Sequence, residues 1–164
     1  MNDGHHTFRN RGGAWVVTQS VLMAAVMVLG VATGSKELEL PVVVTGAIIF
    51  LTGGYLGIAG VMVLGRNRTP YPKPNPGSEL VRRGIYSRVR HPLYSSVMLA
   101  SIGWALIWQS CSALVVAFAL VPFFRAKARL EERWLREKFP DYREYARLVP
   151  GFIPRLKPVA KVCL

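Results

Sequence analysis

The clearest pattern in the chain is three long runs without a charged residue, separated by polar segments. The first, 14–33, is 20 residues long, which matches the length of a helix that crosses a bilayer. The second, 41–65, contains Gly53-x-x-x-Gly57, a spacing that suits close helix–helix contact but also occurs in ordinary packing. The pattern therefore predicts membrane-spanning helices at 14–33 and 41–64.

The third uncharged run, 93–124, is too long for one crossing at ~1.5 Å of rise per residue. Its most polar point is at 108–112, so we interpret it as a helical hairpin. One helix is expected from about Pro92 to Trp108 and another from about Ser112 onward. Each arm is short, which leaves open a tilted pair, a thinned bilayer or an incomplete crossing.

Charge distribution selects between topologies. The chain has 21 Lys and Arg against 9 Asp and Glu. With four spans, 20 of these 21 positive residues lie on one side, in the N-terminal tail, in the 66–91 loop and in the tail from Arg125. Positive charge favours the cytoplasmic side, so both termini are expected in the cytoplasm. A three-span chain would place the two most basic segments on opposite sides of the membrane. Nucleic-acid binding, the other common reason for a basic chain, would not explain the uncharged runs.

These patterns predict an all-α, polytopic membrane protein of about four transmembrane helices, in a bacterial inner membrane or another cell membrane. A cytoplasmic tail, 1–13, would precede a single domain, 14–164. Within that domain we expect a cytoplasmic loop at 66–91, a hairpin at 92–125 and a cytoplasmic tail at 126–164 that includes an amphipathic helix.

Two features of the cytoplasmic loop could build a site. Prolines at 70, 72, 74 and 76 favour an extended chain, which is either a stiff linker or the wall or lid of a cleft. Next, Arg90 and His91 precede Pro92, a residue suited to the first turn of a helix. Free N–H groups and partial positive charge at a helix start favour anions, so this segment is suited to bind a carboxylate.

The tail from residue 126 carries a second candidate feature. The segment 126–139 has an apolar stripe at helical spacing and ends before Pro140. Glu131 and Glu132 lie in it among basic residues. They either pair with neighbouring arginines and lysines on a solvated face, or receive a ligand's ammonium group or hydroxyls. A zwitterionic ligand would satisfy both features.

Other chemistry has little support in the sequence. We find no glycine-rich nucleotide loop and no Ser/His/Asp series. Cys111 and Cys163 are far apart and are expected to be ordinary thiols. His5 and His6 lie in a polar tail. We expect no metal site.

Two stretches, LVRRGIYSRVRHPLY and LEERWLREKFPDYREYARLVPGFIPRL, flank the hairpin. In this order they resemble the isoprenylcysteine carboxyl methyltransferase and phospholipid methyltransferase superfamily, integral membrane enzymes that use S-adenosylmethionine. The resemblance covers about 64–156. The chain is one residue shorter around 139–142 than many relatives, and it lacks the longer substrate loops of the eukaryotic prenyl-protein enzymes.

The resemblance implies a cofactor pocket, with positions carried over from the family's motifs. Its first part would be Gly84, Tyr86, Val89, Arg90, His91, Pro92 and Tyr94. The acidic pair, Glu131 and Glu132, would contribute to the same site. The tail residues that would close over the cofactor and approach the substrate are Tyr142, Tyr145, Arg147 and Arg155.

The two lines of reasoning give one functional expectation. The helix start with Arg90 and His91 would bind the carboxylate of S-adenosylmethionine, and Glu131 or Glu132 its ammonium group or ribose hydroxyls. Aromatic side chains would contact the adenine or the sulfonium cation: Tyr86, Tyr94, Trp134 and Tyr145. Arg147 is our candidate catalytic residue, because it could orient an anionic substrate. No base is assigned.

The expected methyl acceptor is a lipophilic small molecule or lipid that enters from the bilayer. It could be an isoprenylcysteine-like carboxylate, a phospholipid amine or a thiol. Two alternatives stay open. One is a non-catalytic membrane scaffold or transport accessory with the same fold, and the other is a related membrane reductase that binds a nicotinamide cofactor.

Overall fold

The computed structural model describes residues 12–37 and 39–157. Within these ranges the elements are five α-helices and two short 3-10 turns, and no strand occurs. They are α2 (Gly13–Ala32), α3 (Leu40–Leu64), η1 (Gly65–Asn67), η2 (Gly84–Ser87), α4 (Pro92–Ile107), α5 (Cys111–Lys138) and α6 (Tyr142–Leu148). The all-α expectation is therefore confirmed.

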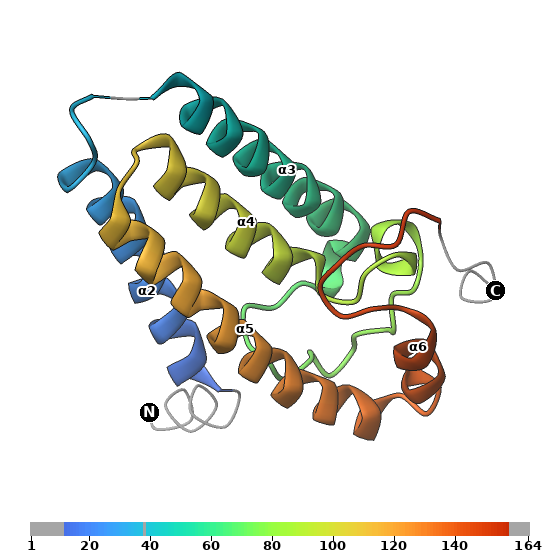
Figure 1. Ribbon diagram of the computed structural model, residues 1–164. Coiled ribbons are helices and arrows are strands. Elements are labelled where there is room, and N and C mark those ends of the chain that lie inside the picture. The colour runs from blue at the N-terminus through green and yellow to red at the C-terminus, as the bar shows by residue number, and fades with distance from the viewer. Residues whose placement is uncertain (1–11, 38, 158–164) are drawn as a thin grey trace.

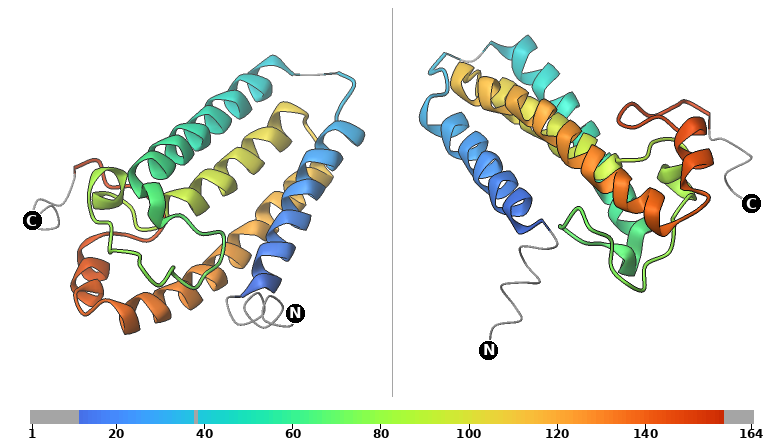
Figure 2. Two further views of the ribbon diagram at one scale, coloured as in Figure 1. Left: turned by 180° about the vertical axis from the view of Figure 1, so that it is seen from behind. Right: turned by 90° about the horizontal axis from the view of Figure 1, so that it is seen from below.

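The four long helices run back and forth between two ends of the molecule (Figure 1, Figure 2). The link from α2 to α3 and the turn from α4 to α5 lie together at one end, where the backbone N–H of Ser35 donates to the carbonyl of Trp108 at 2.9 Å. The loop before α4, helix α6 and the tail gather at the other end. Successive long helices are therefore antiparallel, and α4 and α5 form a helical hairpin.

Helices α3 and α4 pack most closely, and glycine makes this possible. A Cβ atom built on Gly103 would lie 2.5 Å from the backbone N of Phe50, and one on Gly53 would lie 2.7 Å from the backbone N of Ala100. On Gly57 it would lie 2.6 Å from the hydroxyl of Ser96. The Gly53/Gly57 spacing therefore does mark a close helix–helix contact.

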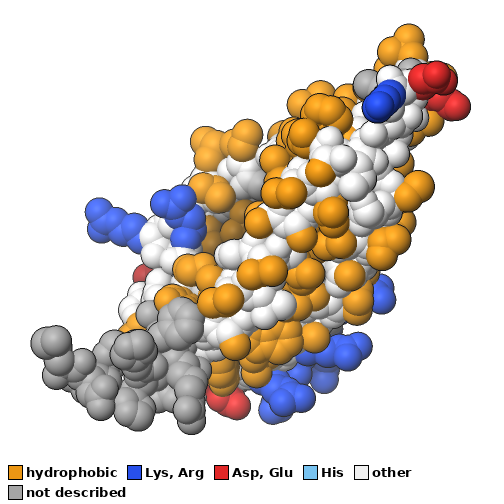
Figure 3. All heavy atoms as spheres, turned by 90° about the vertical axis from the view of Figure 1, so that its left-hand side faces the viewer, with side chains coloured by type: hydrophobic (Ala, Val, Ile, Leu, Met, Phe, Trp, Pro, Cys, Tyr) orange, Lys and Arg blue, Asp and Glu red, His pale blue; other side chains and the backbone are white. Residues whose placement is uncertain are grey.

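Three helices are long and apolar enough to cross a membrane: α2, α3 with the turn that follows it, and α5. Helix α4 has only 16 residues, a rise of ~24 Å against a hydrocarbon core of ~30 Å. Large apolar side chains such as Val21, Leu51 and Phe118 are more than half exposed. Figure 3 shows hydrophobic side chains over the middle of one face, with most visible Lys and Arg toward its lower end. Such a surface is stable in lipid rather than in water.

Helix α5 joins two segments that the sequence analysis described separately. The expected amphipathic segment 126–139 is helical, and it continues the second helix of the hairpin without a break, since α5 spans 28 residues. The change from apolar to charged residues at Arg125 alters the surroundings of the helix and not its backbone. The Ser110 hydroxyl accepts from the N–H of Ala113 at its start, and the helix stops before Phe139 and Pro140 as expected. Glu131 and Glu132 therefore lie on a rigid extension of a membrane helix.

The tail after α6 returns along the segment that precedes α4. The N–H groups of Arg90 and His91 donate to the carbonyls of Pro150 and Gly151, each at 2.9 Å. The N–H of Arg155 donates to the carbonyl of Arg88 at 3.1 Å. A small second core of Tyr142, Tyr145 and Val149 fixes α6 and the tail to the end of the bundle.

Candidate functional site

A cavity lies where α4 begins and α5 ends. Its walls come from the end of α3, residues 67–81, η2, the first turn of α4, α5 and α6. Eight residues predicted from the sequence line it: Tyr86, Arg90, His91, Pro92, Tyr94, Glu131, Tyr142 and Tyr145. Segments that are far apart in the chain thus form one pocket.

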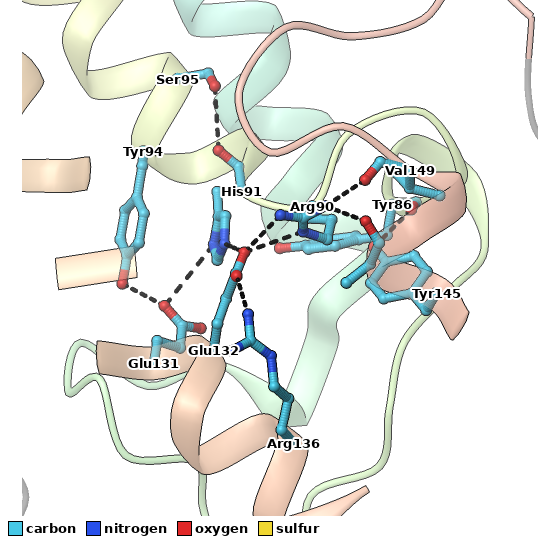
Figure 4. A network of polar contacts seen from close by, with 11 residues as sticks. Tyr86, Arg90, His91, Tyr94, Ser95, Glu131, Glu132, Arg136, Tyr145 and Val149 are labelled. Carbon is cyan, nitrogen blue, oxygen red and sulfur yellow. Dashed lines mark hydrogen bonds and ion pairs between the residues drawn. The ribbon is translucent and has the colours of Figure 1, made fainter. Parts of the chain in front are cut away.

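Glu132 forms the most densely bonded group beside this pocket (Figure 4). Its Oε1 accepts from Arg90 Nε at 3.0 Å and Nη2 at 2.8 Å, and lies 3.0 Å from His91 Nε2. Its Oε2 accepts from Arg136 at 3.0 Å. Burial alone would raise the pKa of Glu132, but the hydrogen bonds from His91 and Arg90 and their charges outweigh it and lower the pKa to about 2. Glu132 is therefore a fixed anion inside the protein.

Arg90 extends this group into the tail. Its Nη1 donates to the carbonyls of Ala146, at 2.7 Å, and Val149. All three guanidinium nitrogens thus bond to other parts of the chain, and one arginine connects α5, α6 and the tail. The geometry favours a supporting role for Arg90, and its expected bond to a ligand's carboxylate stays a prediction.

Glu131 has a different environment from its neighbour. It lines the cavity, whereas Glu132 does not. The Tyr94 hydroxyl donates to Glu131 Oε2 at 2.6 Å, and His91 Nδ1 lies 3.9 Å from the same oxygen. The Tyr94 ring stacks on His91 with centroids 5.4 Å apart. One carboxylate of the acidic pair therefore faces the ligand space while the other fixes the surrounding structure.

Two tyrosines of α6 complete the pocket. The Tyr145 hydroxyl donates to the carbonyl of Tyr86 at 2.7 Å. The Tyr142 hydroxyl is buried and has no hydrogen-bond partner among residues 12–37 and 39–157. Burial raises the pKa of both phenols well above 10, so each hydroxyl keeps its proton. Tyr142 thus brings an unused donor to the pocket wall.

The first turn of α4 supplies further donors. Pro92 has no N–H, and those of Arg90 and His91 are bonded to the tail. Leu93 and Tyr94 line the cavity, and their N–H groups belong to the first helical turn, where no intrahelical acceptor exists. Anion binding at this helix start stays a prediction, and its backbone donors would be those of Leu93 and Tyr94.

Six of the residues expected at the site lie outside the cavity lining: Gly84, Val89, Glu132, Trp134, Arg147 and Arg155. Gly84 has φ +59°, and a Cβ there would lie 2.7 Å from Val63, so its role is backbone shape. Val89 is fully buried. Arg147 is exposed on α6, and its catalytic role stays a prediction.

Residues 67–81 contribute most of what the sequence reasoning missed. We call residues 69–79 the strap. The unpredicted lining residues are Leu64, Asn67, Thr69, Pro74, Ser78, Glu79, Leu80, Val81, Leu93, Leu135 and Phe139. The proline run was the available signal, and its cleft-wall interpretation agrees with the structure. The strap is fixed by Lys138, which donates to Pro76 O and Ser78 Oγ at 2.8 Å.

Comparison with known proteins gives a consistent set of relatives. Residues 41–142 match the family model described as phospholipid methyltransferase. The chain is 32% identical over 149 residues to the nickel-cobalt-cadmium resistance protein NccN of Alcaligenes xylosoxydans xylosoxydans, with 90% of this chain and 66% of that protein covered. It is also 32% identical over 151 residues to the cobalt-zinc-cadmium resistance protein CzcN of Cupriavidus metallidurans, covering 90% and 65%.

A third relative is named for a methylation reaction. It is the protein-S-isoprenylcysteine O-methyltransferase B of Arabidopsis thaliana, which is 30% identical over 113 residues, with 66% of this chain and 57% of that protein covered. The chain spans less than two thirds of the length of each of these three relatives. The family match includes the strap, the start of α4 and the acidic pair.

Proposed function

This chain belongs to the phospholipid methyltransferase family, and from that premise we propose that it is an integral membrane enzyme that uses S-adenosylmethionine to methylate a lipophilic small molecule or lipid. One observation carries the proposal. The cavity unites Tyr94, Glu131 and Tyr142 at the end of a membrane bundle, although these residues lie on three different helices.

The residues present suit the zwitterionic end of the cofactor. Its carboxylate would accept from the first-turn N–H groups of Leu93 and Tyr94. Glu131 would accept from the ammonium group or the ribose hydroxyls, and Tyr142 would donate its unused hydroxyl hydrogen. Tyr86 and Tyr145 offer aromatic surface to adenine or the sulfonium cation.

When bound, S-adenosylmethionine supplies an activated methyl group. This chain's residues bind the two reactants, orient them and exclude water. His91 and Glu132 keep the α4 start and the acidic helix at a fixed spacing through their 3.0 Å contact. We assign no catalytic base, because the acceptor group decides whether one is needed.

Part of the pocket lining is apolar. Leu80 follows the strap, Leu135 and Phe139 lie at the end of α5, and Leu64 and Leu93 lie at the ends of two membrane helices. An apolar wall next to the bilayer favours an acceptor that comes from the lipid. We place this end of the bundle in the cytoplasm of a bacterial or other cell inner membrane, because it carries most of the lysines and arginines.

Arg147 stays our candidate for orienting an anionic acceptor. It is exposed on α6, next to Ala146, whose carbonyl is bonded to Arg90. We expect Arg147→Ala to raise the KM for the acceptor more than it weakens cofactor binding. The opposite pattern in steady-state kinetics would remove Arg147 from the acceptor side.

The test of the proposal is calorimetric binding of S-adenosylhomocysteine to the detergent-purified protein. We expect wild-type binding, a loss of about tenfold or more in Glu131→Gln, as for a charge-assisted hydrogen bond, and no change in Glu137→Gln. Glu137 is exposed on the same helix, so it controls for the removal of one negative charge. Absence of wild-type binding in folded protein would support a scaffold, a transport accessory or, if a nicotinamide cofactor binds, a reductase.

A further inference from the structure

Lys127 lies on α5 and is only 1% exposed. Its Nζ donates to Gln19 Oε1 at 2.6 Å and to the carbonyl of Pro70 at 3.0 Å. The same nitrogen lies 5.4 Å from the centroid of the Tyr94 ring. Lys127 does not line the cavity, so the proposed function gives it no role so far.

A buried ammonium group is a costly feature at this place. The charge loses its hydration near the end of a membrane helix, and its bonds must offset that loss. Even a paired buried charge contributes little net stability, because replacement of a whole buried ion pair by well-packed apolar residues is often neutral or stabilising. Stability of the fold is therefore a weak explanation for a lysine here, and its three contacts suggest another.

Two of these contacts lead to two different walls of the pocket, one on α4 and one at the start of the strap. Tyr94 lines the cavity and donates its hydroxyl hydrogen to Glu131. Pro70 directly follows Thr69, the first cavity residue of the strap. The third contact, Gln19, belongs to α2, a helix that supplies no lining residue of its own.

We propose that Lys127 is a positioning residue of the pocket. From behind Tyr94, its ammonium group fixes the tyrosine ring and the start of the strap at a set spacing, and it links α2 to both walls. The role rests on the proposed function, because the spacing matters through the cofactor that the two walls enclose. Lys127 acts through Tyr94 and Pro70 and does not touch the reactants.

The first test compares S-adenosylhomocysteine binding by calorimetry in wild type, Lys127→Met, Lys127→Arg and Arg129→Met. Methionine keeps the length of the side chain and removes the charge, whereas arginine keeps the charge. We expect methionine to weaken binding about tenfold and arginine to restore it to within about threefold of wild type. Arg129 is exposed on the same helix, so its variant should bind as wild type does.

The second test needs no ligand. Hydrogen–deuterium exchange would follow the amides of Tyr71, Lys73 and Asn75, which alternate with the prolines of the strap. We expect faster exchange in Lys127→Met than in Arg129→Met, with unfolding temperatures of both variants close to wild type. If Lys127→Met loses structure broadly, Lys127→Arg is compared with wild type instead, and it should show wild-type exchange at these amides.

The outcomes separate the two proposals. Wild-type binding that Lys127→Met leaves unchanged, or strap exchange that it leaves unchanged, overturns the role of Lys127. If the wild type does not bind S-adenosylhomocysteine, the proposed function fails, and the exchange measurement still decides whether Lys127 holds the strap.

Discussion

Replacement of Glu132 by glutamine is the change we expect to destabilise α6 and the tail after it most. The Glu132 side chain is 11% exposed, and its carboxylate pairs with Arg90, His91 and Arg136. Glutamine keeps the size of the side chain and removes the charge, so the Arg90 guanidinium loses its anion in a buried place. Loss of one partner of a buried pair costs ~3–5 kcal/mol. Arg90 also holds Ala146 and Val149, so α6 and the tail should loosen with it.

The pKa of Glu132 gives a second measure of the same interaction. It lies at about 2 in the folded protein against 4.5 for a free carboxyl group. At ~1.4 kcal/mol per pKa unit, this difference stabilises the fold by about 3 kcal/mol at neutral pH. Because the folded-state pKa is the lower one, the stabilisation is fully present above pH 4.5 and is lost as the pH falls toward 2. Glu132→Gln should lack this part of the acid sensitivity.

The assay is chemical unfolding in detergent, followed by tryptophan fluorescence at pH 7 and at pH 3.5. We expect Glu132→Gln to lose about 3 kcal/mol at pH 7 and the difference from wild type to shrink at pH 3.5. Glu137→Gln, exposed on the same helix, should stay within ~0.5 kcal/mol of wild type. A loss below ~1 kcal/mol in Glu132→Gln, or an equal loss at both pH values, would refute this reasoning.

Three further substitutions test other parts of the structure. Tyr142→Phe removes a buried hydroxyl without a described partner, so the unfolding temperature should not change. Binding of S-adenosylhomocysteine should weaken about three- to tenfold. Unchanged affinity in calorimetry would place that hydroxyl outside the cofactor contacts. Gly84→Ala puts a Cβ at φ +59° and 2.7 Å from Val63, and we expect a loss of ~1–3 kcal/mol in unfolding experiments; wild-type stability would show that the loop adapts. Gly103→Ala places a Cβ 2.5 Å from the backbone of Phe50, which should separate α3 from α4 and lower the yield of monodisperse protein in gel filtration; a normal yield would contradict the tight α3–α4 contact.

The sequence was sufficient to predict the helices, because their signals are local. Uncharged runs located α2 and α3, and the polar point at 108–112 located the turn between α4 and α5. The continuity of α5 was not predictable from hydropathy, because Arg125 changes the solvent around a helix without interrupting its hydrogen bonds. The sequence therefore did not show whether 112–125 and 126–139 form one helix or two.

Eight of the residues expected at the site line one cavity, but the sequence did not predict how they are arranged around it. Arg90, His91 and the acidic pair do lie together. Adjacent glutamates are about 100° apart around a helix, so only the packing of α5 against α4 decides that Glu131 faces the pocket and Glu132 faces Arg90. Lys127 was missed for a related reason: its contacts to Gln19 and Pro70 span 108 and 57 residues.

The central claim is that this pocket transfers a methyl group from S-adenosylmethionine to a lipophilic acceptor. The direct measurement is incubation of the purified protein, in vesicles of total bacterial lipid extract, with methyl-labelled S-adenosylmethionine. The account predicts label in the organic phase with wild type and Glu137→Gln, and a strong reduction with Glu131→Gln. Label confined to water-soluble products would contradict a lipophilic acceptor, and absence of label in both phases, from protein that binds S-adenosylhomocysteine, would contradict the enzymatic account.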